Sequence, residues 1–290
     1  MHKPQVEWRI EFAQHLFEKV NTIEGIKACF IGGSVCRNMA DEYSDLELCF
    51  VWKKPIEDAK RLLFNEKLEG KSIYLNHNKN LNQTEESFYF NGFQVDIYHT
   101  SISATNTIIN DVLEHHDIQF SKLIHLNVLQ NALPIFGESI LENWKEQIRA
   151  YPNEIAVAII EKYTQRFFMA NVPLFIFRKD WTIFYNLIAG YQKNIFLVLT
   201  ALNKVYFSGF KNSYQHIKNL QIKPSGILDI YDKLYDLPPN EMWQSIVDLK
   251  LKVLNLIEEH FSNVEIKHIY ERVNQGRGKF SKSPIADMSN

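Results

Sequence analysis

Apolar residues near the start of the chain recur at two spacings, one typical of helices and one typical of strands. The first set lies four residues apart, at Trp8, Phe12, Leu16 and Val20. This spacing predicts a helix over residues 8–20. The apolar run Ile26–Ile31 ends at glycines, which predicts a buried strand. Polar and apolar residues then alternate over residues 45–50, which predicts a second strand with one face on a core.

The next fifty or so residues predict one more helix and three more strands. Pro55–Leu68 has helical spacing with proline in its first turn, and Ile73–Leu75 reads as a short strand. Ser87–Phe90 and Phe93–His99 both alternate, and they are separated by Asn91-Gly92. This dipeptide suits a tight turn, so the two segments predict a β-hairpin.

Helical spacing dominates the second half of the chain. Three long segments show it, Ile155–Ala170, Trp181–Phe207 and Met242–Phe261, with prolines at the joints between them. Residues 274–290 contain few large apolar side chains and no periodic pattern, which predicts a mobile tail.

These patterns together predict an α+β fold with two domains. We expect a mixed-sheet domain over residues 1–150, an all-helical bundle domain over residues 151–273 and the tail over residues 274–290. The chain has 290 residues and 46% apolar content, which suffices for two cores.

Charge and cysteine content narrow the classes of function. The net charge is only -2, from 32 basic and 34 acidic side chains, so no field gathers polymeric nucleic acid or an anionic membrane. The three cysteines, Cys29, Cys36 and Cys49, form no C-x-x-C pair, which indicates reduced thiols. No segment is typical of a signal peptide or a membrane span, so we expect a cytoplasmic protein.

A glycine turn and two acids lie close together after the first predicted strand. Gly32 and Gly33 allow the backbone to approach a ligand closely, and Ser34 adds a hydroxyl. The short helix that follows presents free N–H groups, to which a phosphate group binds well. Arg37 carries a positive charge that can offset a polyphosphate, or it can pair with a nearby surface acid such as Asp41.

Three carboxylates predict a metal site beside this turn. Asp45 and Glu47 lie two apart on one predicted strand, so both emerge on the same face. Asp96 lies between Val95 and Ile97 on the later hairpin strand, and it joins them if the two strands are neighbours. Converging carboxylates repel one another unless a cation neutralises them, and Mg²⁺ prefers oxygen ligands. A triphosphate and Mg²⁺ together indicate phosphoryl or nucleotidyl transfer.

Over residues 26–100 the chain resembles the nucleotidyltransferase superfamily, which has a polymerase-beta-like fold. The resemblance rests on Gly33-Ser34, on Asp45-Leu46-Glu47 and on Asp96. The run Leu197–Lys211 also resembles the helical domain of the bacterial antibiotic nucleotidyltransferases that act on aminoglycosides and lincosamides.

The resemblance implies roles for these residues. Gly33 and Ser34 would grip the triphosphate, Asp45 and Glu47 would bind both metal ions, and Asp96 would complete one ion and help to activate the acceptor hydroxyl. Glu47 stands where the superfamily more often has aspartate. The longer side chain leaves two alternatives, an active transferase or a fold with altered metal chemistry.

In such enzymes the helical half commonly supplies a general base. Asp180 and Glu161 are the candidates, and Asp180 can instead be the N-cap of the following helix. Lys211 could contact the polyphosphate. Apolar helices such as Ile195–Phe207 could form either the domain core or a homodimer interface.

These features predict an Mg²⁺-dependent enzyme that transfers NMP, with AMP from ATP expected, to a hydroxyl group of a small molecule and releases pyrophosphate. Residues 151–273 contain 14 Lys or Arg and 12 Asp or Glu. This near balance favours an acceptor less charged than an aminoglycoside. The alternatives are a non-catalytic nucleotide-binding or interaction module that retains the fold, and a nucleotidyltransferase that acts on RNA or protein.

Overall fold

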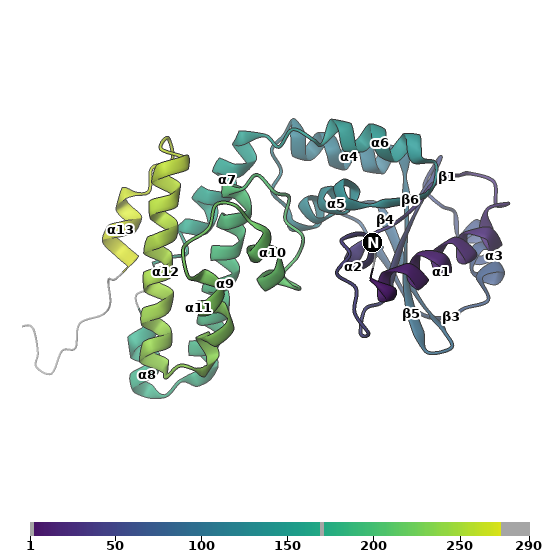
Figure 1. The fold of residues 1–290 in the computed structure, drawn as a ribbon. Coiled ribbons are helices and arrows are strands. Elements are labelled where there is room, and N and C mark those ends of the chain that lie inside the picture. The colour runs from purple at the N-terminus through teal and green to yellow at the C-terminus, as the bar shows by residue number, and fades with distance from the viewer. Residues whose placement is uncertain (1–2, 169–170, 274–290) are drawn as a thin grey trace, which may run out of the picture. The chain divides into compact units, whose positions relative to one another are not determined.

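The structure is a computed structural model that describes residues 3–168 and 171–273, and it divides into two compact units (Figure 1). One unit extends to Pro152 and includes Tyr206–Ser208; the other comprises Asn153–Val205 and the chain from Gly209 onward. The fold class is α+β, as the sequence predicts. The expected mobile tail, residues 274–290, lies outside the described residues.

The first unit is built on a six-stranded sheet in the order β3-β4-β5-β2-β1-β6. β2 and β5 pair in parallel and the other neighbours pair antiparallel, so the sheet is mixed as expected. The strands are β1 Ile26–Ile31, β2 Leu46–Trp52, β3 Lys71–Asn78, β4 Gln83–Phe90, β5 Phe93–Ser101 and β6 Leu133–Phe136. The sequence pattern does not predict β6, which has only four residues and contains a proline.

Helices of the first unit pack on the sheet. They are α1 Pro4–Val20, α2 Gly33–Cys36, α3 Asp58–Leu68, α4 Ile102–Leu113, α5 Phe120–Asn131 and α6 Glu138–Gln147. α1 and α3 share one buried core with the apolar face of the sheet, to which Leu46, Leu48 and Ile97 belong. The helix expected from Pro55 begins instead at Asp58, because Glu57 keeps an extended backbone.

The hairpin between β4 and β5 sets the register that the site depends on. Asn91 and Gly92 have φ angles of 50° and 87°, so both take the left-handed conformation of a type I′ turn. The predicted hairpin is therefore confirmed. This turn pairs Ser87 with Asp96 across the two strands.

A buried polar cluster joins α3 to the core face of the sheet. Glu86 is 1% exposed and accepts hydrogen bonds from Arg61 Nη1 at 2.7 Å and from Asn65 Nδ2 at 2.8 Å. His99 Nε2 lies 3.4 Å from Glu86 Oε2, and the indole N–H of Trp52 donates to His99 Nδ1. Burial raises the pKa of Glu86, but the contacts with His99, Asn65 and Arg61 outweigh it and lower that pKa. Glu86 is therefore a buried carboxylate kept charged by its partners.

The second unit contains only helices among its described residues. They are α7 Asn153–Thr164, α8 Val172–Arg178, α9 Trp181–Leu202, α10 Ser213–Asn219, α11 Ile227–Lys233, the 3₁₀ helix Leu234–Asp236, α12 Pro239–His260 and α13 Lys267–Val273. Across the described part of the chain, none of the helices combines the length and the apolar character that crossing a bilayer requires.

Two of the long helices end earlier than the sequence predicts. α7 ends at Thr164, where helix was expected as far as Ala170, and α9 ends at Leu202 rather than Phe207. At the end of α9 the side-chain amide of Asn203 donates from Nδ2 to the backbone carbonyl of Leu199 at 2.8 Å and to that of Ile222 at 2.7 Å. These bonds satisfy the helix end and fix the chain that follows.

Candidate active site

Two adjacent strands bring Glu47 and Asp96 together. β2 and β5 run parallel, and Glu47 lies directly opposite Asp96 in their register. Side chains directly opposite one another lie on the same face, about 5 Å apart in the direction of pairing. Asp45 directly precedes β2 rather than lying within it, and it is half-buried. β2 and β5 are therefore adjacent strands, as the prediction for Asp96 requires.

The phenol of Tyr98 lies among four carboxylates. Tyr98 follows Asp96 by two residues on β5 and therefore shares its face. Burial raises the pKa of Tyr98, and four negative charges raise it further, namely those of Glu47, Glu85, Asp96 and Asp45. Tyr98 therefore remains protonated. Glu85 and Tyr98 were not among the predicted site residues. Glu85 precedes Ser87 by two residues on β4 and lies on the same face, but residues 83–87 are all polar and show no alternation that would mark that face.

Asp96 is held by two side chains. Ser87 Oγ donates to Asp96 Oδ1 at 2.6 Å, and Gln94 Nε2 donates to the same oxygen at 3.0 Å. Ser87 comes from the opposite position on β4, whereas Gln94 precedes Asp96 by two residues on its own strand. Such bonds orient a carboxylate before any ligand arrives.

The glycine turn lies against Glu47. Gly33 has a φ of 62°, and a Cβ at that position would lie 2.6–2.8 Å from the three carboxylate atoms of Glu47. The N–H of Gly32 donates to the backbone carbonyl of Glu47 at 3.0 Å. Only glycine fits this backbone and this contact. The expected close approach thus involves the Glu47 carboxylate, while binding of phosphate by Gly33 and Ser34 stays a prediction.

Arg37 follows the single turn of α2. It is half-buried, and among the described residues its buried Nε has no hydrogen-bond partner. Within the same described ranges it forms no ion pair with Asp41, whose carboxylate instead accepts hydrogen bonds from Ser44 and Tyr43 at 3.0 Å. The structure therefore shows no Arg37–Asp41 pair among the described residues. Its contact with nucleotide stays a prediction.

Arg9, from α1, fixes the loop that leads to Asp45. Arg9 is 1% exposed, and its Nη2 donates to the carbonyl of Asp41 at 2.9 Å and to that of Ser44 at 2.5 Å. Burial lowers the pKa of Arg9, and the charges of Asp41 and Asp45 oppose this shift. An arginine stays charged even so, and Arg9 is a positive group near Asp45 that was not among the predicted site residues.

The three predicted acids are ligands of the type that a hard cation prefers, but they do not surround a common position. The acids Asp45, Glu47 and Asp96 offer only carboxylate oxygens, the ligands that Mg²⁺ prefers. In the ranges that the structure describes, however, no group of three or more His, Cys, Asp or Glu side chains is placed to hold an ion together. Mg²⁺ usually binds one or two carboxylates and completes its shell with water and substrate phosphates. The Glu47–Asp96 pair fits an ion of that kind.

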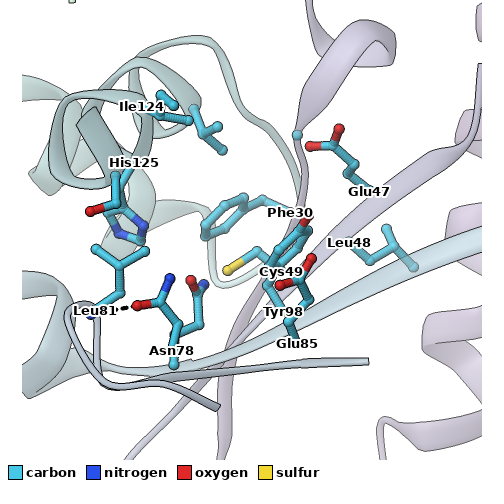
Figure 2. Close-up of a pocket in the computed structure, with 14 residues that line it drawn as sticks. Phe30, Glu47, Leu48, Cys49, Asn78, Leu81, Glu85, Tyr98, Ile124 and His125 are labelled. Atoms are coloured by element: carbon cyan, nitrogen blue, oxygen red, sulfur yellow. Dashed lines mark hydrogen bonds between the residues drawn. The ribbon is translucent and has the colours of Figure 1, made fainter. Parts of the chain in front are cut away.

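A cavity of about 280 Å³ lies on the same face of the sheet (Figure 2). Glu47 and Gly32 line it together with Glu85, Tyr98 and His125, the last from α5. The cavity therefore shares residues with the carboxylate group and with the glycine turn.

The remaining predicted residues belong to the second unit, where Glu161 lies exposed on α7. Asp180 occupies the N-cap position of α9, as the alternative interpretation predicted, although its carboxylate caps none of the described backbone amides. Lys211 is exposed between α9 and α10. The roles of Asp180 as general base and of Lys211 as a polyphosphate contact stay predictions.

Comparisons with protein-family models and with curated proteins find no match. Among solved structures, the chain is similar to a nucleotidyltransferase-like protein from Exiguobacterium sibiricum 255-15, with 11% identity, a TM-score of 0.40 and coverage of 86% of this chain and 75% of that one. The Cid1 poly(U) polymerase with MgGTP bound is 20% identical, with a TM-score of 0.28 and coverage of 44% and 43%. A CCA-adding enzyme with CTP is 12% identical, with a TM-score of 0.30 and coverage of 94% and 69%. These likenesses concern the fold, and the chain spans less than half of the poly(U) polymerase.

Proposed function

We propose that the protein is an Mg²⁺-dependent nucleotidyltransferase. It transfers NMP from an NTP, with AMP from ATP as the expected case, to a hydroxyl group of a small molecule. The observation that carries the proposal is the pairing of Glu47 with Asp96 on adjacent strands, with the Gly33 turn packed against the Glu47 carboxylate. A glycine turn beside paired carboxylates is an arrangement suited to a triphosphate and its cation.

The reaction uses these residues in separate roles. Glu47 and Asp96 would hold Mg²⁺, which when bound offsets the negative charge of the triphosphate, and Asp45, directly before β2, is the third predicted ligand. The acceptor hydroxyl loses its proton to a carboxylate and its oxygen bonds to the α-phosphorus, while the bond from that phosphorus to the bridging oxygen breaks and pyrophosphate leaves. Asp96 is suited to orient the hydroxyl because Ser87 and Gln94 fix its own carboxylate.

The choice of acceptor rests on charge. Residues 151–273 carry 14 basic and 12 acidic side chains, which does not provide the excess of acid that would concentrate a polycation. A small molecule with a hydroxyl group and little charge is therefore the proposed acceptor.

The test is incubation of the purified protein with each labelled NTP, Mg²⁺ and a panel of hydroxyl compounds, with pyrophosphate release as the readout. We expect Asp96→Asn and Glu47→Gln to lower the rate by at least about a hundredfold, as the loss of a group that stabilises the transition state does. Asp58→Asn is the matched control, because it removes an exposed carboxylate of α3. The proposal fails if no NTP is turned over and Asp45→Asn binds nucleotide as the wild type does.

A non-catalytic nucleotide-binding module is the second candidate, favoured by the lack of a three-ligand metal group among the described residues. It predicts that ATP raises the melting temperature equally with and without Mg²⁺, since a ligand stabilises the state it binds. The enzyme predicts a larger rise with Mg²⁺ that Asp96→Ala abolishes. An RNA oligonucleotide and a protein mixture in the acceptor panel test the macromolecular alternatives.

A further inference from the structure

One row of side chains crosses four strands on the face of the sheet that carries the carboxylates. Glu47 lies opposite Asp96, and Asp96 lies opposite Ser87. Ser87 in turn lies opposite Tyr74 on β3, the outermost strand at that edge of the sheet. Residues directly opposite one another share a face, and neighbouring strands lie about 5 Å apart, so Tyr74 lies on the face of the proposed site, roughly 10 Å from Asp96.

The residues that line the cavity support this assignment of the face. Asn78 on β3 and Glu85 on β4 line it together with Glu47 (Figure 2). Tyr74 precedes Asn78 by four residues, and the pairing of β3 with β4 has no register shift between them. Alternate residues of a strand share a face, so Tyr74 lies on the same face as Asn78.

A second tyrosine lies on the other side of Ser87. Tyr89 follows Ser87 by two residues on β4 and therefore shares its face. Tyr74 and Tyr89 are diagonal neighbours across the two strands, and aromatic side chains reach one another over such a diagonal. Tyr74 is 49% exposed and Tyr89 is 40% exposed. We call these two exposed residues the tyrosine platform.

The charges around the tyrosine platform favour an uncharged ligand. Glu85 lies two residues before Ser87 on β4, and Asp96 lies opposite Ser87. Lys71, which is exposed, lies opposite Tyr89. A strand of RNA carries one negative charge on each phosphate, so along this row it would meet several carboxylates and a single lysine. A small molecule with little charge avoids this repulsion.

We propose that the acceptor carries a planar ring, which packs on Tyr74 and Tyr89 while its hydroxyl group lies at Asp96. The proposal rests on the proposed function and narrows its acceptors to small aromatic hydroxyl compounds. Aromatic side chains stack with planar rings of many kinds. Ser87 lies between the platform and Asp96 and donates to its carboxylate at 2.6 Å, so ring and hydroxyl are positioned against one rigid part of the sheet.

The test compares phenyl, cyclohexyl and methyl β-D-glucoside as acceptors, with ATP and Mg²⁺ present. The three compounds offer the same hydroxyl groups and differ in carrying a planar ring, a puckered ring or no ring. Uridine and ribose form a second pair of this kind. We expect kcat/KM to be about tenfold higher for the compound with the planar ring, as stacking on aromatic side chains provides. Calorimetry with each compound measures affinity without turnover.

Substitutions on the two strands locate the effect. Tyr74→Leu and Tyr89→Leu keep an apolar side chain but remove the ring, and each should raise the KM for phenyl β-D-glucoside about three- to tenfold without changing the KM for ATP. Tyr74→Phe keeps the ring and should retain the wild-type KM. Leu75→Ala is the matched control, because Leu75 is 44% exposed on the same strand but lies opposite Glu86, on the other face. Melting curves show that each variant is folded.

The outcomes separate this proposal from the proposed function. Equal kcat/KM for the three glucosides, or a wild-type acceptor KM in both leucine variants, overturns the planar-ring assignment and leaves nucleotidyl transfer intact. Transfer to an RNA oligonucleotide but to none of these compounds assigns the face to RNA and also overturns it. A dimer in sedimentation that Tyr74→Leu and Leu75→Ala both dissociate assigns this edge of the sheet to a second copy of the chain, with the same consequence.

Calorimetry decides the case in which no NTP is turned over with any acceptor. That result rejects the proposed function. Tighter binding of phenyl than of methyl β-D-glucoside, lost in Tyr74→Leu, would then still support a planar-ring site on the tyrosine platform. Equal binding of the two compounds, or binding of neither, overturns it.

Discussion

Substitution of Gly33 by alanine tests the contact between the glycine turn and Glu47. The residue has a φ of 62°, where an alanine costs about 1–2 kcal/mol of strain. The new Cβ would also lie 2.6–2.8 Å from the Glu47 carboxylate, so that side chain must leave its position. Moving a side chain to a less favourable rotamer costs roughly 0.5–1.5 kcal/mol. We expect Gly33→Ala to lower the free energy of unfolding by about 1.5–3.5 kcal/mol from these two terms together.

A double-mutant cycle isolates the contact from the strain. Glu47→Ala removes the carboxylate, so Gly33→Ala in that background should cost only the strain. The coupling between the two substitutions should therefore be about 1 kcal/mol, within the usual range for residues in contact. Gly226→Ala is the matched control, because Gly226 also has a positive φ of 76° but an added Cβ meets no atom of a described residue within 4 Å.

Urea unfolding of the single and double variants measures the cycle, and pyrophosphate release from the single variants measures the consequence for the site. Gly33→Ala should lower the rate at least about tenfold because it displaces Glu47, whereas Gly226→Ala should leave the rate unchanged. Additive free energies for Gly33→Ala and Glu47→Ala, within about 0.3 kcal/mol, would refute the reasoning. Equal coupling of Glu47→Ala to Gly226→Ala would refute it as well.

Three further predictions concern single side chains. The folded-state pKa of His125 is about 4, below its ordinary value of 6.5, so between these pH values only the unfolded state binds the proton. The free energy of unfolding should therefore fall by about 3 kcal/mol as the pH falls from 6.5 to about 4. In the His125→Phe variant, unfolding measured against pH should not show this decrease. Glu86→Gln should lower the free energy of unfolding by about 3–5 kcal/mol because it breaks a buried charged cluster. The exposed Asp58→Asn should change it by less than about 0.5 kcal/mol. Equal effects of the two substitutions in urea unfolding would contradict this prediction. Ser87→Ala should lower kcat more than it raises the KM for NTP, because Asp96 loses a hydrogen bond. Ser87→Thr, which keeps the hydroxyl, should restore kcat. Unchanged kcat and KM in Ser87→Ala would show that this bond does not position Asp96.

Local sequence patterns predict correctly those helices, strands and turns whose ends depend only on neighbouring residues. Ile26–Ile31 forms β1 over the predicted residues, and Asn91-Gly92 turns the hairpin as its conformational preference demands. β6 was not predicted because four residues carry little periodic signal and their extended form depends on pairing with β1. α9 stops before its apolar pattern does, because the side chain of Asn203 binds the carbonyl of Ile222, a residue 19 positions away.

The candidate site shows the same division. Asp45, Glu47 and Asp96 could be found because their spacing on strands is a local property. Arg9, Glu85 and His125 could not be found in that way, because an arginine on an amphipathic helix, an acid on a strand and a histidine on an apolar helix face are each unremarkable in sequence. Only packing reveals that the three lie beside the site or its cavity.

The sequence by itself determined the two-part division into sheet and helices, the glycine turn and the acids that flank it. Those features follow from periodicity and from backbone preferences, which act over a few residues. Tertiary structure alone decided that β5 pairs beside β2, that the Glu47 carboxylate lies on Gly33, and that a cavity lined by His125 adjoins both. The physical reason is that register, close contact and burial depend on which distant segments meet, and no local pattern encodes that meeting.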